Sequence, residues 1–323
     1  MKANAIWVTD IGKIECRPMK IPDNPEDNEV QIRVKACGVC AYDAALFRGI
    51  TAEQPMPYTL GHEAVGIIEK VGKNVAGWKV GDRVFSGQGG GFAEYVNLEA
   101  CCIARIPAYI EDFAQAVLEP ACCITSMIQQ ADLKPGAHVA LVGAGYMGLL
   151  AVQALMRATA IGLLTVFEID PDRRQLALQY GAAECCNPLD TDGKSKIDQI
   201  IADGGADVVI DFSGSESGFV LSDKLISGAG TLILGAWHRH DLTFSGTRWH
   251  LAGVQVKNLA PQSNKYFREI IPATSLLAER GVYDQTALIT HVADISDMEA
   301  VQHLFERAVD KKDHYLKGVV TFM

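Results

Sequence analysis

The sequence predicts an α/β protein with two domains, one built on a doubly wound parallel sheet and one on irregular β structure. A length of 323 residues suits two domains at roughly 150 residues each. Beyond about residue 110, strand-length and helix-length apolar segments alternate, which indicates βαβ units and a parallel sheet. The first hundred residues contain short strands separated by glycine-rich turns instead.

The β-rich part begins with a strand at 29–36, where apolar and polar residues alternate. Further strands are expected at 64–71 and 80–85, each bordered by glycine.

The second part gives the alternation of a parallel sheet. Strands are expected at 138–142, 163–169, 208–212 and 231–234, and helices at 113–127, 146–159, 172–180 and 218–226. Beyond residue 255 the pattern is mixed, with helices at 265–278 and 297–308 and a last strand at 317–322. We therefore expect a domain of residues 119–255 and a discontinuous domain of residues 1–118 and 256–323.

The composition argues against nucleic acid and membrane partners. Acidic residues outnumber basic ones by 39 to 29, and the net charge of -10 repels phosphate backbones and anionic lipids. The uncharged stretch 139–156 is long enough to span a bilayer, but its glycines belong to a turn motif. Because the first residues lack a signal-peptide pattern and six of nine cysteines form adjacent pairs, we expect a cytoplasmic protein without disulfides.

The strongest local motif is Gly143-Ala144-Gly145-Tyr146-Met147-Gly148, which follows the strand 138–142 and opens a helix. Its first glycine allows a tight turn, the second lets a pyrophosphate approach the backbone, and the third permits close helix packing. The helix N-terminus attracts the diphosphate charge. The motif therefore predicts a dinucleotide site.

Glu168 ends the next strand, 20 to 25 residues beyond the motif, where an acid accepts hydrogen bonds from the adenosine ribose. A carboxylate there repels the 2'-phosphate of NADP, so NAD is favoured. Arg173, one turn into the next helix, is the residue that could accommodate that phosphate instead.

A second set of motifs offers metal ligands: Cys37-Gly38-Val39-Cys40-Ala41-Tyr42-Asp43, Gly61-His62-Glu63 and Leu118-Glu119-Pro120. A catalytic zinc takes three protein ligands from thiolate, imidazole and carboxylate, and soft thiolate suits zinc better than magnesium or calcium. Taken singly, these motifs are weak signals: a Cys-x-x-Cys is also compatible with buried thiols, and a lone His-Glu pair is more often a surface or core pair than a ligand.

Together these motifs resemble the zinc-dependent medium-chain dehydrogenase/reductase family of alcohol and polyol dehydrogenases, over essentially the whole chain. Further motifs that carry the resemblance lie at Gly81–Val84, Glu168–Pro171, Leu288–His291 and Leu316–Val320. The resemblance implies a chaperonin-10-like catalytic domain at 1–118 and 256–323 and a Rossmann domain that binds NAD at 119–255. It also implies a homo-oligomer, either a dimer or a tetramer.

The resemblance implies that Cys40 and His62 bind zinc together with a carboxylate, which is Glu63 or Glu119. It gives Asp43 the role of orienting His62. For the cofactor it implies contacts from Ser213, Gly235 and Ala236, and from Lys317 near the diphosphate. Trp237, His238 and His240 follow the strand that ends beside the nicotinamide and are candidates for substrate contact.

Two departures from the family pattern matter. Tyr42 replaces the usual Ser or Thr of the proton relay, and alanine stands at Ala45 where a relay histidine is expected. The Tyr42 phenol either carries the proton or only shapes the pocket while Glu63 and water move it. Because 85–95 contains no cysteine, the four-cysteine structural zinc site is missing, and one catalytic zinc per chain is expected.

The expected reaction is the interconversion of a secondary alcohol and its ketone with NAD(H). Glu119-Pro120 matches the polyol subgroup and favours a polyol, sugar alcohol or cyclic polyol as the small-molecule substrate. One alternative is a zinc-free quinone or enone reductase of the same fold. Another is a sensor that binds NAD without catalysis.

Overall fold

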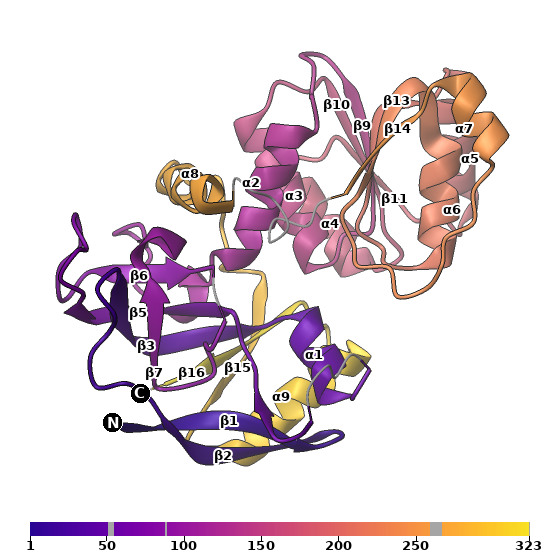
Figure 1. The fold of residues 1–323 in the computed structure, drawn as a ribbon. Coiled ribbons are helices and arrows are strands. Elements are labelled where there is room, and N and C mark those ends of the chain that lie inside the picture. The colour runs from indigo at the N-terminus through magenta and orange to yellow at the C-terminus, as the bar shows by residue number, and fades with distance from the viewer. Residues whose placement is uncertain (51–54, 88, 259–266, 323) are drawn as a thin grey trace. The chain divides into compact units, whose positions relative to one another are not determined.

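The computed structural model describes residues 1–50, 55–87, 89–258 and 267–322 (Figure 1). The chain forms two compact units. Unit 1 comprises the described residues of Met1–Cys122, Tyr266–Arg280 and Asp284–Met323, and unit 2 those of Cys123–Lys265 and Gly281–Tyr283. Both borders differ slightly from the sequence-based ones at 118/119 and 255/256, because 119–122 group with unit 1 and the strand that crosses residue 256 groups with unit 2.

Unit 2 is built on a six-stranded parallel sheet. Its strand order is β11 (Glu184–Cys186), β10 (Leu163–Phe167), β9 (His138–Val142), β12 (Ala206–Asp211), β13 (Ile226–Leu234) and β14 (Gln255–Asn258). Counted along the unit this is 3-2-1-4-5-6, the doubly wound order. The prediction of a doubly wound parallel sheet is thus confirmed, and all but one residue of each central strand, β9 and β12, is buried, as expected when both faces are covered.

Helices cover this sheet on both faces. Figure 1 shows α3 (Tyr146–Ala158) and α4 (Pro171–Gln179) on one side, and α5 (Thr191–Ala202), α6 (Glu216–Leu225) and α7 (Gly246–Ala252) on the other. Asp170, Asp190, Ser215 and Ser245 cap four of them, each accepting a hydrogen bond from a backbone N–H of the first turn. The sequence analysis did not predict α5 or α7, because α5 is polar and α7 spans only two turns.

Unit 1 contains a seven-stranded mixed sheet. Its path is β15 (Ile289–Asp294), β16 (Lys317–Thr321), β3 (Glu29–Val39), β5 (Glu63–Val71), β6 (Arg83–Ser86) and β8 (Ile103–Arg105), and β7 (Tyr95–Glu99) pairs with β3. A smaller antiparallel sheet of β2 (Lys13–Lys20), β1 (Lys2–Asp10) and β4 (Tyr58–Thr59) lies in the same unit. Six strands of this unit were not predicted from the sequence: β1, β2, β4, β7, β8 and β15.

Three helices of unit 1 are α1 (Ala41–Phe47), α8 (Phe267–Glu279) and α9 (Met298–Asp310). The α9 ring of Phe305 packs against Phe47 and Phe92, with ring centroids 5.6 and 5.4 Å away. The helix predicted at 265–278 corresponds to α8, and its first two residues lie outside the described residues.

The helix predicted at 113–127 is wrong in its first part. The chain forms a short 3-10 turn, η2 (Ala114–Ala116), and then a new helix, α2 (Glu119–Gln130). Pro120 explains the break, because proline lacks a backbone N–H and is tolerated only in the first turn of a helix. A continuous helix from residue 113 would place it in the interior.

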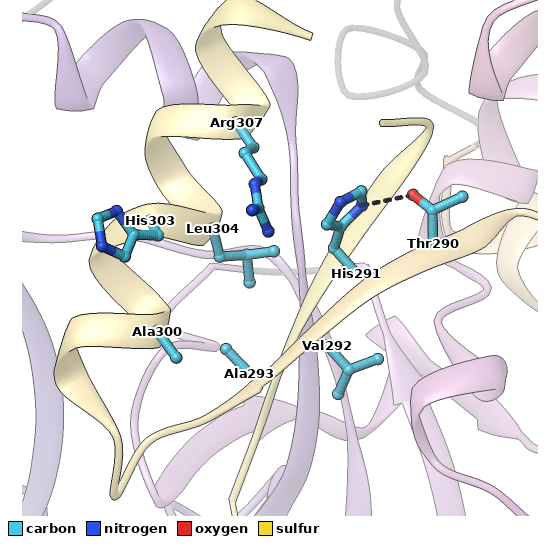
Figure 2. Close-up of a pocket in the computed structure, with 8 residues that line it drawn as sticks. All are labelled: Thr290, His291, Val292, Ala293, Ala300, His303, Leu304 and Arg307. Atoms are coloured by element: carbon cyan, nitrogen blue, oxygen red, sulfur yellow. Dashed lines mark hydrogen bonds between the residues drawn. The ribbon is translucent and has the colours of Figure 1, made fainter. Parts of the chain in front are cut away.

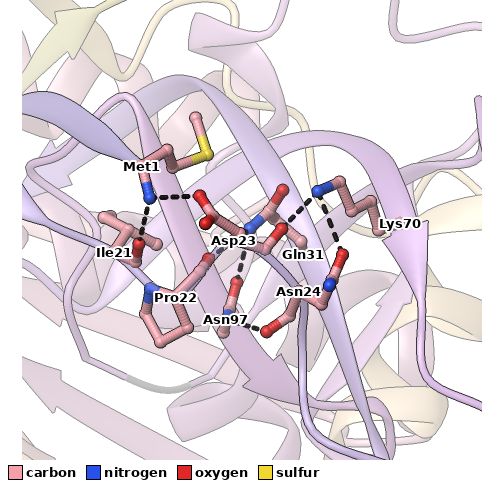
Figure 3. Close-up of polar contacts among 8 residues, drawn as sticks. All are labelled: Met1, Ile21, Pro22, Asp23, Asn24, Gln31, Lys70 and Asn97. Carbon is pink, nitrogen blue, oxygen red and sulfur yellow. Dashed lines mark hydrogen bonds and ion pairs between the residues drawn. The ribbon is translucent and has the colours of Figure 1, made fainter.

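Polar contacts surround the connection between β2 and β3 in unit 1 (Figure 3). The Met1 ammonium forms an ion pair with Asp23, and Lys70 donates a hydrogen bond to the Asp23 carbonyl. The buried Gln31 amide donates to the Asn97 side-chain oxygen at 3.1 Å. These contacts link Met1 and β5 to the connection between β2 and β3, and link β3 to β7.

Across the described ranges, every helix is too short or too polar to cross a bilayer. The uncharged stretch 139–156 is divided between β9 and α3, which belong to the buried core of unit 2.

Candidate functional site

Asp43 holds together the two segments that carry the expected zinc ligands in unit 1. Cys40 lies between β3 and α1, and its backbone N–H donates to Asp43 Oδ2 at 2.9 Å. The backbone N–H of Gly61 donates to Asp43 Oδ1 at 3.0 Å. Gly61 has φ +93°, and a Cβ there would lie 2.7 Å from Phe92, so this turn requires glycine.

The structure brings the thiol, imidazole and carboxylate together. The ligand atoms of Cys40, His62 and Glu63 all lie within 4.8 Å of one another. His62 Nδ1 is 4.0 Å from Asp43 Oδ1, so the buried acid faces the imidazole. These four residues lie on β5, α1 and the connections beside them.

Glu63 has a second partner, Lys317 of β16. The Lys317 ammonium donates to Glu63 Oε1 at 2.6 Å, and both side chains are buried. Gly38 leaves room for this pair, because a Cβ there would lie 2.0 Å from Glu63 Oε2. The resemblance placed Lys317 near the cofactor diphosphate, whereas in unit 1 its ammonium neutralises a carboxylate of the zinc-ligand cluster.

Glu119 lies in the first turn of α2, outside the 4.8 Å group but close enough to influence its charges. It is only 3% exposed, and burial is the main cause that raises its pKa to about 7. The charge of Glu63 also raises this pKa, while His62 and Lys317 oppose the shift. Both carboxylates named by the sequence analysis are therefore near His62.

The cluster favours a positive charge at its centre. Burial alone lowers the pKa of His62, but the hydrogen bond with Cys40 and the carboxylates of Asp43 and Glu119 outweigh it and raise the pKa to about 11. The same anionic surroundings suit a divalent cation. Thiolate, imidazole and carboxylate are the donors that zinc takes in catalytic sites, so these residues fit the metal that the family implies.

Tyr42 follows Cys40 by two residues in α1 and is 41% exposed. Its side chain is therefore partly accessible to solvent.

In unit 2, the three glycines of the motif have different surroundings. Gly143 has φ +93°, and a Cβ there would lie 2.7 Å from the backbone nitrogen of Ser213. A Cβ at Gly148 would lie 2.1 Å from the Gly143 carbonyl oxygen. No atom lies within 4 Å of a Cβ built at Gly145, which precedes the α3 residues Tyr146 and Met147. The open side of Gly145 is where a pyrophosphate can approach the helix N-terminus.

Glu168 is buried and anchors the glycine loop. Its Oε2 accepts a hydrogen bond from the Ala144 N–H at 2.6 Å, and its Oε1 accepts one from the Asp170 N–H at 2.9 Å. Each carboxylate oxygen can accept a second bond, so capacity for a ribose diol remains. The Arg173 guanidinium faces Asp170 Oδ2 at 3.8 Å, while Arg174 donates to the carbonyls at 168 and 169.

The sequence analysis missed Asp211, which organises the other expected cofactor contacts. It ends β12, is fully buried, and its Oδ1 accepts hydrogen bonds from the Ser213 N–H and hydroxyl at 2.8 and 2.6 Å. Its carbonyl accepts bonds from the N–H groups of Gly235 and Ala236, and its Oδ2 lies 3.2 Å from His238 Nε2. The sequence did contain a signal for Asp211, because it is an acidic residue at the end of an apolar strand of the predicted parallel sheet.

A groove of about 390 Å³ in unit 1 lies elsewhere, between β15 and α9 (Figure 2). Its lining includes His291, whose Nδ1 lies 2.9 Å from Thr290 Oγ1, and the α9 side chains of His303 and Arg307. None of the expected metal, catalytic or cofactor residues lines this groove.

Two glycine variants should separate folding from nucleotide binding. Gly143→Ala should lower the free energy of unfolding by about 1–3 kcal/mol, because a Cβ meets backbone atoms at a left-handed φ. Gly145→Ala should leave stability unchanged and raise the dissociation constant of the dinucleotide at least about tenfold, since the added methyl faces open space. Thermal unfolding and nucleotide titration measure both effects. Unchanged affinity in Gly145→Ala would place the pyrophosphate elsewhere.

Comparisons with known proteins match both parts of the chain. Residues 26–108 match the alcohol dehydrogenase GroES-like domain, and residues 147–275 match the zinc-binding dehydrogenase domain. The chain is 28% identical to (R,R)-butanediol dehydrogenase of Bacillus subtilis, covering 84% of this chain and 87% of that protein. It is 27% identical to sorbitol dehydrogenase of Bacillus subtilis, covering 99% and 97%.

A solved structure also has the same fold. An Escherichia coli oxidoreductase/dehydrogenase of unknown specificity superposes with a TM-score of 0.89 at 24% identity, covering 100% of both chains. Together with the GroES-like match, this confirms the predicted combination of a Rossmann sheet and a chaperonin-10-like domain.

Proposed function

Because this chain belongs to the zinc-dependent medium-chain dehydrogenase/reductase family and is an oxidoreductase of its alcohol dehydrogenase type, we propose that it interconverts a secondary alcohol of polyol type and its ketone with NAD(H). The observation that carries this proposal is the group formed by Cys40, His62 and Glu63 within 4.8 Å. A zinc-free reductase or a nucleotide sensor has no need for such a group. The polyol class is favoured by Glu119-Pro120 and by relatives named for butanediol and sorbitol.

In this proposal Cys40 and His62 hold one catalytic zinc together with Glu63 or Glu119. When bound, zinc supplies Lewis-acid stabilisation of negative charge on the substrate oxygen. Asp43 orients His62 and fixes the two ligand-bearing segments through its hydrogen bonds to Cys40 and Gly61. Lys317 holds Glu63 in place and limits the negative charge that the buried cluster carries.

A nicotinamide cofactor bound to unit 2 would supply the hydride acceptor or donor. In unit 2 the proposed dinucleotide site is the Gly143–Gly148 loop with Glu168, and Asp211 holds Ser213, Gly235 and Ala236 at the carboxyl edge of the same sheet. We propose NAD rather than NADP because the buried Glu168 carboxylate, with Arg173 turned to Asp170, disfavours a 2'-phosphate.

A substrate screen tests the proposal directly. Protein as purified is incubated with polyols, inositols, sugars and amino alcohols, with NAD⁺ or NADP⁺, while reduced nicotinamide absorbance is followed. The same preparation is assayed for zinc. We expect turnover of a secondary alcohol with NAD⁺ by zinc-containing protein. Turnover of quinones or enones by metal-free protein would identify the reductase alternative, and nucleotide binding without turnover of any compound would identify the sensor.

Tyr42→Phe tests the proton route. If the phenol carries the proton released from the alcohol, loss of its hydroxyl should lower turnover by about 10²-fold, and we expect this result. The measurement is kcat over the pH range with the substrate found in the screen. Near-normal kcat with an altered order of substrate preference would show that the ring only shapes the pocket, leaving Glu63 and water to move the proton.

A further inference from the structure

A second set of metal-ligating side chains lies in unit 1, where β7 leads into β8. Glu99 is the last residue of β7, and Cys101 and Cys102 belong to the 3-10 turn η1 (Ala100–Cys102) that follows. Their ligand atoms all lie within 4.8 Å of one another. We propose that Glu99, Cys101 and Cys102 form a second metal site, which binds a thiophilic divalent cation such as Zn²⁺ or Cd²⁺.

Two of the three distances between the ligand atoms match tetrahedral coordination. Two thiolates at about 2.3 Å from a tetrahedral ion lie about 3.8 Å apart, and a carboxylate oxygen at about 2.1 Å lies about 3.6 Å from each sulfur. Here the two Sγ atoms are 3.9 Å apart, and Cys101 Sγ is 3.2 Å from Glu99 Oε2. These two distances lie within a few tenths of an ångström of the tetrahedral values, and the third, between the Glu99 carboxylate and Cys102 Sγ, is below 4.8 Å.

A disulfide between the two cysteines is a poor alternative. Neighbouring Cα atoms across a trans peptide are about 3.8 Å apart, whereas a disulfide needs about 4.4–6.8 Å. A metal ion can bridge the two sulfurs without moving the backbone. Two thiolates also select thiophilic ions over magnesium or calcium.

Arg268 of α8 supports the third ligand. Its guanidinium donates to Glu99 Oε2 at 2.7 Å, which leaves Oε1 and a second lone pair of Oε2 for other partners. A ligating carboxylate is commonly held by such an outer hydrogen bond. Two thiolates and a carboxylate carry three negative charges, and a divalent cation together with this guanidinium balances them.

The site has an open side and a closed side. Cys101 is exposed and Cys102 is buried, so an ion can enter from solvent past Cys101 and keep a water as its fourth ligand. A single zinc was expected from the sequence because residues 85–95 lack the four closely spaced cysteines of a structural zinc site. The proposed site combines two cysteines with a carboxylate, and it therefore differs from a four-cysteine site.

Cadmium titration tests this site in the full chain. Chelator-treated, reduced protein is incubated with Cd²⁺, passed through a desalting column and analysed for bound metal. Cys101→Ser should bind one equivalent fewer than the wild type and lose part of the thiolate-to-cadmium absorbance in the ultraviolet. Cys16→Ser, which removes another exposed cysteine, should bind as many equivalents as the wild type. Arg268→Gln should weaken binding of this equivalent by about 10–100-fold.

Equal binding by Cys101→Ser and the wild type would overturn the proposal. The dehydrogenase proposal is judged separately, because alcohol oxidation should persist in Cys101→Ser. If the wild type oxidises no alcohol but Cys101→Ser still binds one cadmium equivalent fewer, the second metal site is supported and the dehydrogenase proposal is refuted.

Discussion

His62→Ala should lower turnover of the alcohol by at least about 10³-fold and remove one equivalent of zinc from the protein. The imidazole is one of three ligand groups within 4.8 Å, and the polarisation that zinc supplies amounts to several kcal/mol, at 1.4 kcal/mol for each factor of ten. Steady-state kinetics and elemental analysis of the same preparation give the two results. NAD⁺ affinity should change little, because the glycine motif and Glu168 belong to unit 2.

His303→Ala is the matched control for this experiment. That histidine is on the exposed face of α9 beside Glu306 and takes no part in the cluster. We expect its turnover and zinc content to equal those of the wild type. Full turnover by a zinc-free His62→Ala protein would remove the basis for a metal-dependent reaction and favour the zinc-free reductase.

Glu168→Ser should narrow or reverse a preference for NAD over NADP that we expect to be at least about tenfold in kcat/KM. The buried carboxylate repels a 2'-phosphate, and serine removes that charge. The substitution also removes the hydrogen bond that Glu168 Oε2 accepts from the Ala144 N–H, so affinity for both dinucleotides should fall. The measurement is kcat/KM with each cofactor.

Glu168→Gln separates these two effects, since the amide keeps one oxygen to accept a loop hydrogen bond but carries no charge. Glu168→Gln should narrow the preference for NAD over NADP, and it should reduce the affinity for both dinucleotides less than Glu168→Ser does. Arg173→Ala added to Glu168→Ser should abolish the gain with NADP, if Arg173 leaves Asp170 to meet the phosphate. Equal use of both cofactors by the unmodified protein would show that Glu168 does not determine the choice.

The architecture and the dinucleotide motif could be predicted because their signals are local. Strand and helix periodicity repeats within a few residues, and the glycine spacing of Gly143–Gly148 depends on one turn. The break before α2 was missed, although Pro120 signals it, since a missing N–H is a property of the residue itself. Strand β1, which lies between β2 and β4, and the edge strand β15 were missed.

The sequence by itself thus determined the family, the fold class and the residue types available for zinc and NAD. Only the tertiary structure decided their partners: Lys317 lies against Glu63, Asp211 against His238, and Arg268 against Glu99 beside the two cysteines. Lys317 and Glu63 are 254 positions apart, on β16 and β5, which both flank β3. Periodicity tells which face of a strand is buried, but the pairing of strands and their register decide which side chains meet on that face.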